Sequence, residues 1–229
     1  MNRFLSKETS LRFLKNIQGS GLPTVYDHQK HRLIFVDEAG NELFFFRLPI
    51  VLAPPGEVPY PEDKEVNYVI LLIQAGNCAL GYFKDGVNLN HKVFRSYMVR
   101  KKQGTSQIKY LKTKGKSRAG SRVRLGETME FFENINERLQ EYFEQHDIHR
   151  VAISCSKTLL PYLYDSAIET PFDKKDPRLF KIPKHIHTPI YDVLIDANKF
   201  LMKGELIYED IHQPIINELL NEDQSEPEI

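Results

Sequence analysis

A short run of small residues that ends in a glutamine, Gly104-Thr105-Ser106-Gln107, holds the clearest chemical potential in this sequence. Glycine lets the backbone turn tightly and approach a ligand closely, and the two hydroxyls add hydrogen-bonding groups. The glutamine amide has donors and an acceptor but no useful pKa, so it cannot act as an ordinary general base. Such an amide can instead position a water molecule or, with its backbone N–H, stabilise developing oxyanion charge.

This run lies inside a strongly basic segment of a chain that is neutral overall. The protein has 229 residues, with 31 Lys and Arg against 31 Asp and Glu, yet residues 87–125 contain no acidic residue. Charge of one sign concentrated in this way favours a polyanion as the partner. Twelve cations lie in the segment: Lys92, Arg95, Arg100, Lys101, Lys102, Lys109, Lys112, Lys114, Lys116, Arg118, Arg122 and Arg124.

Two alternative roles for the basic segment fit the sequence less well. A solvated insertion without a specific partner normally mixes charges of both signs, and this segment does not. A helix that lies on a membrane surface carries aromatic and aliphatic anchors, which this segment lacks.

The spacing of apolar residues predicts the elements that position the basic segment. An almost continuously apolar run, residues 66–75, predicts a central strand that is covered on both faces. The turn pairs Gly76-Asn77 and Asp85-Gly86 favour antiparallel connections to the two strands that follow. The further expected elements are strands at 31–37, 42–48, 78–84, 89–97, 150–154 and 205–208, and helices at 6–18, 127–145, 157–166 and 189–202.

This order of elements predicts an α/β (α+β) fold, with a mixed β-sheet flanked by helices. Residues 98–126 form a long basic loop between the third strand of the meander and the best helix, and loops of this length are usually functional or disordered. Prolines between residues 49 and 61 favour a boundary near residue 60. We therefore expect an N-terminal helix and β-hairpin extension at 1–60, a catalytic domain at 61–212 and an acidic tail at 213–229.

Cysteine usage and the N-terminus indicate the compartment. Cys78 and Cys155 cannot supply a zinc finger or a disulfide framework, and both lie in apolar, strand-like runs. We therefore expect buried, reduced thiols, with the cytoplasm as the default location. Charged residues interrupt the apolar run that a secretory signal would need, and no apolar stretch is long enough to span a bilayer.

Three other groups of residues invite a functional interpretation. His185 and His187 supply only two metal ligands, with no carboxylate or thiol at ligand spacing, so we favour a surface pair. Asp192 and Asp196 could form the paired acids of a nuclease, but their spacing also places them on the solvent face of a helix, which we favour. Phe44-Phe45-Phe46 predicts core residues plus one exposed aromatic, with base stacking as the alternative.

The sequence around the glutamine resembles the VLRF (Vms-like release factor) domain. It runs YMVRKKQGTSQ from Tyr97, then a Lys- and Gly-rich stretch, then AGSRVR before the long helix. The family pattern is R-x-K-Q-G-[GTS]-x-Q, a basic linker and A-G-[SA]-x-[LV]-R-R, and Leu125 stands where the last arginine is expected. The resemblance extends from about Val66 to Tyr208. That domain is similar to the middle domain of eukaryotic and archaeal class I release factors, whose loop carries Gly-Gly-Gln.

The resemblance implies a release-factor middle-domain-like (RNase H-like) fold and a bacterial-type member, in which residues 1–60 are an addition. It implies that Gln107 is the catalytic glutamine and that Gly104, Thr105 and Ser106 complete its loop. Such domains free stalled nascent chains from tRNA on the large ribosomal subunit, by hydrolysing the peptidyl-tRNA ester or by cutting the tRNA near its CCA end. The residues expected to contact tRNA or ribosomal RNA are Arg100, Lys101, Lys102, Lys109, Lys112, Lys114, Lys116, Arg118, Arg122 and Arg124.

We therefore expect an enzyme of ribosome quality control, a peptidyl-tRNA hydrolase or a tRNA endonuclease-like release factor. Its partners would be the large ribosomal subunit, peptidyl-tRNA and ribosomal RNA, and it would work as a monomer without a cofactor, a metal or a membrane. The alternative is a non-catalytic ribosome- or RNA-binding module, in which Gln107 is incidental. A metal-dependent nuclease on a mixed sheet is a third hypothesis.

Overall fold

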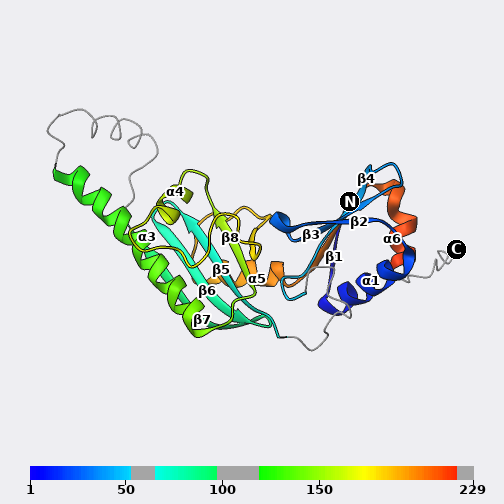
Figure 1. Ribbon diagram of the computed structural model, residues 1–229, viewed down its shortest axis with the longest axis horizontal. Helices are drawn as coiled ribbons and strands as arrows, with labels where there is room; N and C mark the ends of the chain where they lie inside the picture. Colours follow the sequence, from blue (N-terminus) through cyan, green and yellow to red (C-terminus); the bar gives the residue numbers. More distant parts are fainter. Residues whose placement is uncertain (53–64, 97–118, 221–229) are drawn as a thin grey trace. The chain divides into compact units, whose positions relative to one another are not determined.

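The computed structural model describes residues 1–52, 65–96 and 119–220, with the backbone alone for 119–125. The chain separates into two compact units (Figure 1). Residues 67–196 form the central unit, and residues 1–66 together with 197–229 form the N-terminal unit. Each unit has its own β-sheet and its own hydrophobic core.

The central unit is built on a five-stranded sheet. Its strands are β5 (Asn67–Gln74), β6 (Asn77–Lys84), β7 (Val87–Arg95), β8 (Arg150–Cys155) and β9 (Leu179–Lys181). Their order is β7-β6-β5-β8-β9, with β5, β6 and β7 antiparallel and with β8 and β9 parallel to β5 and β8 respectively. The expected mixed sheet with an antiparallel meander is therefore confirmed.

The Asp85-Gly86 turn forms as the sequence indicated, but Ala75-Gly76 make the first turn, because Asn77 already begins β6 and pairs with Gln74. Gly76 has φ of 77°, Asp85 of 49° and Gly86 of 92°. Positive φ at these positions is typical of the tight turns that join neighbouring antiparallel strands. Local turn chemistry thus sets the β5–β6 and β6–β7 connections.

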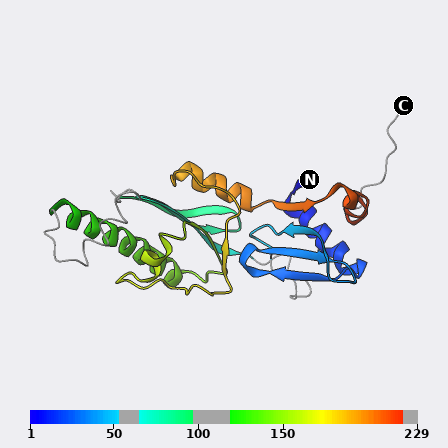
Figure 2. The ribbon, with the colours of Figure 1, turned by 90° about the horizontal axis from the view of Figure 1, so that it is seen from above.

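Helices cover both faces of the central sheet. α3 (Ala119–Gln145) packs Phe131, Ile135 and Leu139 against the face that carries Leu80. α5 (Tyr191–Leu201), inside which the division between the units falls, approaches the opposite face at Gly81. Figure 2 shows α5 in orange and α3 in green on opposite sides of the cyan strands.

Two helices of the central unit differ in extent from the expected ones. α3 starts at Ala119 and not at Glu127, so the last part of the expected loop 98–126 is helical. Glycines at 120 and 126 favoured a loop, but a helical glycine costs only about 1 kcal/mol, which a long packed helix tolerates. α4 (Leu160–Tyr164) is shorter than the expected helix 157–166, because Pro161 occupies its first turn, where proline starts a helix.

The N-terminal unit contains a second five-stranded sheet, in which every pairing is antiparallel. Its strands are β1 (Asn2–Leu5), β2 (Thr24–Asp27), β3 (Arg32–Val36), β4 (Glu42–Arg47) and β10 (Gly204–Tyr208), in the order β1-β10-β4-β3-β2. Short 3-10 turns, η1 (His28–Lys30) and η2 (Asp210–His212), follow β2 and β10. The expected β3–β4 hairpin is present, but β1 and β2 carried no signal that we used.

Helices α1 (Lys7–Ser20) and α6 (Gln213–Leu219) cover this sheet and close its core. The expectation of an acidic tail over 213–229 is wrong for its first part. Ile216, Leu219 and Leu220 are buried at helical spacing, and this apolar stripe outweighs the acidic composition. β10, expected in the 61–212 domain, and α6, expected in the tail, thus both belong with residues 1–66.

Candidate active site

Two elements of the central unit, here called the stems, flank the segment in which the sequence predicts the basic loop. β7 ends at Arg95 before this segment, and α3 begins after it at Ala119 (Figure 1). Residues 97–118, with the candidate catalytic run, lie outside the described residues. The expected site residues in that range are Arg100, Lys101, Lys102, Gly104, Thr105, Ser106, Gln107, Lys109, Lys112, Lys114, Lys116 and Arg118.

The other basic residues of the segment lie on the two stems. Arg122 and Arg124 fall in the first turns of α3, which the structure describes by its backbone. Lys92 and Arg95 are exposed on β7, which is an edge strand of the central sheet. Basic residues therefore border the loop at both of its ends.

One residue joins the two stems where the loop begins. The Ser96 N–H donates to the carbonyl oxygen of Gly76, in the β5–β6 turn, over 2.9 Å. The Ser96 Oγ donates to the main-chain carbonyl oxygen of Glu127, on α3, over 3.2 Å. The end of β7 is thus hydrogen-bonded to a hairpin turn and to the helix at the same point.

A hollow of about 310 Å³ lies beside this junction. Its lining combines aromatic side chains with charged and amide groups. Glu127 Oε2 is buried there without a hydrogen-bond partner among the described residues. The lining residues are Phe94, Arg95, Ser96, Glu127, Glu130, Phe131 and Asn134.

Buried polar contacts fix α3 to the rest of the central unit. The Asn136 Nδ2 donates to the carbonyl oxygens of Leu163 and Ile168 over 2.9 and 2.7 Å, and Asn136 is fully buried. Phe132 stacks on Tyr162 with ring centroids 5.7 Å apart. These two bonds and the packing of Phe131, Ile135 and Leu139 in the core fix α3 from residue 131 onward, next to the predicted loop.

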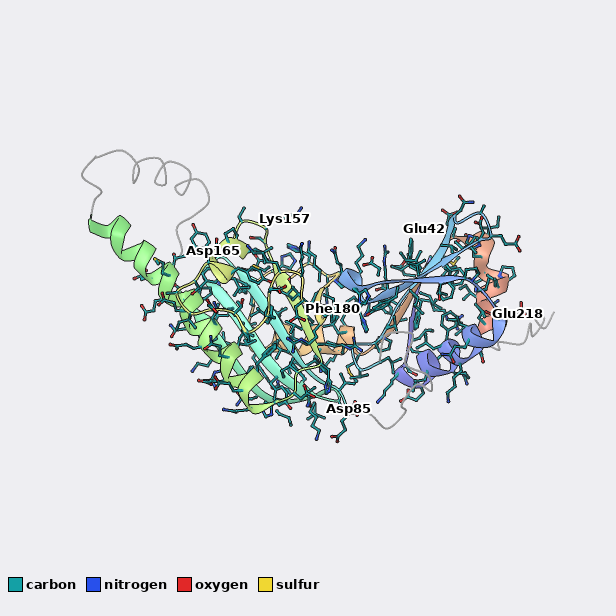
Figure 3. All side chains as sticks on the ribbon, in the orientation of Figure 1. Glu42, Asp85, Lys157, Asp165, Phe180 and Glu218 are labelled. Atoms are coloured by element: carbon teal, nitrogen blue, oxygen red, sulfur yellow. The ribbon has the colours of Figure 1, made fainter. Side chains whose placement is uncertain are left out.

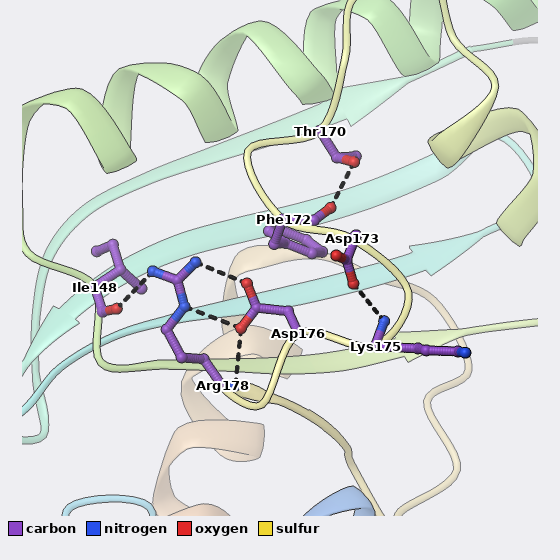
Figure 4. A network of polar contacts seen from close by, with 7 residues as sticks. All are labelled: Ile148, Thr170, Phe172, Asp173, Lys175, Asp176 and Arg178. Carbon is purple, nitrogen blue, oxygen red and sulfur yellow. Dashed lines mark hydrogen bonds and ion pairs between the residues drawn. The ribbon is translucent and has the colours of Figure 1, made fainter.

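In the long connection between β8 and β9, Arg178 forms an ion pair with Asp176 (Figure 4). Arg178 Nη2 and Nε lie 2.7 and 3.0 Å from Asp176 Oδ2 and Oδ1, and Nη1 donates to the Ile148 carbonyl oxygen over 3.3 Å. These hydrogen bonds from Arg178 hold the pKa of Asp176 below its usual range. Through its bond to Ile148, Arg178 also links this connection to the segment between α3 and β8.

A second, more open hollow of about 640 Å³ lies beside α4, near Asp165, which Figure 3 labels. Its rim mixes charges of both signs, with Lys174 Nζ 4.0 Å from Asp165 Oδ1. Its lining also includes Asp173 and Lys175. Such a mixed rim does not have the single-sign field that attracts a polyanion.

The other candidate groups of the sequence lie apart from the stems. His185 and His187 are exposed and meet edge to face at 4.5 Å between ring centroids. Asp192 and Asp196 lie on the exposed side of α5, as expected. Across the described residues, no group of three or more His, Cys, Asp or Glu could hold a metal ion.

Sequence reasoning did not identify Ser96 or Glu127 as site residues. A serine at the end of a strand carries no motif, and its partner is a backbone carbonyl rather than a side chain. The position of Ser96, directly before the loop, was the only signal that could have indicated its role.

Comparisons with known proteins identify relatives of this chain. The chain is 25% identical over 183 residues to the mouse (Mus musculus) tRNA endonuclease ANKZF1, over 72% of this chain and 23% of that protein. It therefore spans about a quarter of the length of that curated relative. A solved structure, the Vms1 mitochondrial localization core, is similar over 91% of this chain and 84% of the other, with a TM-score of 0.44 and 12% identity.

No helix in the described part of the chain is both long and apolar enough to cross a membrane.

A family model, that of the Bacteroidetes VLRF1 release factor, matches residues 68–209 of this chain. This range is more than half of the chain and includes both stems. The chain therefore belongs to the Bacteroidetes VLRF1 release factor family.

Proposed function

We propose that this protein frees stalled nascent chains from ribosome-bound peptidyl-tRNA, as a factor of ribosome quality control in the cytoplasm. The observation that carries the proposal is the match of residues 68–209 to a release-factor family, because this range contains the basic loop with Gln107. The name of the mouse relative, a tRNA endonuclease, supports a substrate that contains tRNA.

In this proposal the Gln107 amide positions the nucleophile and removes no proton itself. For ester hydrolysis, a water oxygen attacks the ester carbonyl carbon and the bond to the ribose oxygen breaks. The ribose oxygen takes up a proton, so the products are a peptide acid and a tRNA with a free hydroxyl. The backbone N–H of the loop stabilises the oxyanion that develops in between.

For tRNA cleavage, the nucleophile is a ribose 2′-hydroxyl of the tRNA. Its oxygen attacks the neighbouring phosphorus, the bond to the 5′-oxygen breaks, and that oxygen takes up a proton. The products are a cyclic phosphate and a 3′ fragment with a free 5′-hydroxyl. The same amide would orient the hydroxyl in this route, and neither route passes through a metal.

Binding would come from the basic residues of the loop and its stems. The residues from Arg100 to Arg124 would contact phosphates of tRNA and of the large ribosomal subunit, where arginine donates in pairs. The fixed base of α3 supports this proposal, because a long cationic segment needs a rigid attachment to aim it. Affinity should fall with salt by about 0.7 log units per log unit for each single-strand phosphate contacted.

The second candidate is a non-catalytic ribosome- or RNA-binding module. It is favoured by the separation of charge, since twelve cations without one acidic residue between 87 and 125 would bind RNA whatever the role of the glutamine. In this case, reversing the charges of Lys101, Lys102, Arg122 and Arg124 would remove the whole effect of the protein.

The test uses Gln107→Ala in a release assay on purified stalled large-subunit complexes that carry peptidyl-tRNA. We expect release to be abolished and binding to stay nearly intact, because alanine removes only the amide. The matched control is Gln145→Ala, an exposed glutamine at the end of α3. Full release by Gln107→Ala would refute the catalytic role and favour the binding module.

A second measurement decides which bond is broken. The 3′ end of the tRNA is sequenced after the reaction. An intact CCA end indicates ester hydrolysis, and a truncated end indicates cleavage of the tRNA. Loss of the tRNA cleavage with a chelator would instead support a metal-dependent nuclease.

A further inference from the structure

Ser96 makes the last hydrogen bond between the two stems that the structure describes before the basic loop. Its Oγ lies 3.2 Å from the Glu127 carbonyl oxygen, and its N–H is held by Gly76. We propose that Ser96 is a positioning residue, whose hydroxyl keeps the stems together so that the loop delivers Gln107 to the substrate in one geometry. This role rests on the proposed function, in which Gln107 acts.

The place of this contact on α3 supports the proposal. From Phe131 onward, α3 is fixed to the sheet by buried aromatic side chains. One turn earlier, Glu127 contributes its carbonyl oxygen to Ser96. At Gly126, one residue before, a Cβ would meet nothing within 4 Å. The contact therefore lies where α3 leaves the packed body.

The acceptor explains why a small hydroxyl can do this work. A helical carbonyl oxygen has two lone pairs, so it can accept from a side chain in addition to its own helical bond. The bond is local and neutral, and a bond of this kind changes the global stability only slightly. Its removal would instead loosen the attachment of the end of β7 to α3, while the pairing of β7 with β6 and the Ser96 N–H bond to Gly76 remain.

Greater mobility at the end of β7 would extend along the chain to the proposed catalytic residue, Gln107. When the ends of a loop are held less firmly, a residue inside the loop samples a wider range of positions. Because a displacement of about 1 Å can lower a rate a hundredfold, the alignment of Gln107 is sensitive to this range. RNA binding through many phosphate contacts is much less sensitive to such a displacement, since each Lys or Arg side chain can adjust its position separately.

The experiment compares Ser96→Ala with Ser96→Thr, which keeps the hydroxyl. The release rate is measured at saturating factor on the stalled large-subunit complexes, and the Kd is measured for the same complexes. We expect Ser96→Ala to lower the maximal rate about fivefold, equivalent to about 1 kcal/mol. The Kd should change less than twofold, and Ser96→Thr should restore most of the rate. The control is Ser156→Ala, an exposed serine whose side chain bonds Thr158.

A second readout does not depend on the release activity. Amide hydrogen exchange in the free protein should become faster over residues 93–96 in Ser96→Ala, but not in Ser96→Thr or Ser156→Ala. An unchanged rate in Ser96→Ala, or a loss that appears only in the Kd, would overturn the positioning role. If Gln107→Ala releases chains fully while exchange changes as expected, the proposed function is wrong although the tether exists.

Discussion

Replacement of Asn136 by alanine should destabilise the central unit far more than a nearly identical change one turn away. The Asn136 amide is fully buried and donates to two carbonyl oxygens, those of Leu163 and Ile168. Two carbonyl partners also fix which end of the amide is the nitrogen, because only the NH₂ group can donate to both. Alanine would leave one buried acceptor, Leu163 O, and one partly buried acceptor, Ile168 O, without a donor.

The magnitude follows from the cost of these orphaned groups. A buried carbonyl that loses its partner costs about 1–3 kcal/mol, and the Ile168 oxygen is only partly buried. Alanine also removes Asn136 Oδ1, which is buried without a partner among the described residues, so we expect a loss of about 2 kcal/mol. The matched comparison is Gln140→Ala, on the next turn of α3, whose Nε2 donates to the Glu169 carbonyl oxygen over 2.8 Å at the surface. Water can replace that bond, so we expect a loss of about 0.5 kcal/mol.

Urea denaturation followed by circular dichroism measures the two variants against the unchanged protein. Hydrogen exchange of the α3 amides assigns the loss to the central unit, since the two units can unfold separately. If Asn136→Ala and Gln140→Ala differ by less than about 1 kcal/mol, burial does not decide the cost of these bonds and the reasoning fails.

Two further predictions concern titration. The pKa of Asp176 is lowered by hydrogen bonds from Arg178, so the stability from this pair is present above the unfolded pKa of about 4 and is lost as the pH falls through the lower folded value. The difference in urea midpoint between the unchanged protein and Asp176→Asn should therefore shrink below pH 4, and a constant difference from pH 2 to 7 would contradict it. Burial raises the pKa of Cys155 to about 12 and that of Cys78 well above its ordinary value, so iodoacetamide at pH 8 should label both slowly until urea unfolds the chain. Rapid labelling of folded Cys78, measured by mass spectrometry, would count against this burial.

The meander that carries the first stem could be predicted from the sequence because its signals are local. The run from Val66 to Ala75 is apolar at nearly every position, and the side chains from Tyr68 to Ile73 are all fully buried. The positive φ values of Gly76 and Gly86 match the turn residues that separate the strands. Each of these features is set by neighbours in the chain, so local patterns were sufficient.

The second sheet could not be assembled from the sequence for the opposite reason. A strand was expected at residues 205–208, but nothing in these residues tells that it pairs with Asn2–Leu5 and Glu42–Arg47. Partners so distant along the chain are chosen by packing, which one sequence does not display. Cys155 shows the same limit, since it is only partly buried although its run is apolar.

In the candidate site, too, local residue types could be interpreted from the sequence, and contacts that depend on packing could not. The glutamine and the cations were found from residue types, and Gln107 lies outside the described residues, so its role stays a prediction. The contact that joins the stems depends on a main-chain oxygen of Glu127 and on the approach of α3 to the end of β7. No residue type indicates that α3 approaches the end of β7, so this contact is visible only in the three-dimensional structure.

The position of β10 inside the N-terminal sheet has a consequence for biosynthesis. β10 lies between β1 and β4, although about 150 residues of chain are made after β4 before it emerges. At about 5–20 residues per second, β1 and β4 wait roughly 10–30 s with open edges while the central unit, contiguous in the chain, is synthesised. Exposed edges of this kind are sites of aggregation, so nascent-chain chaperones should be needed in this interval. Removal of β10 would not trim the sheet at its border but would cut β1 away from the other strands.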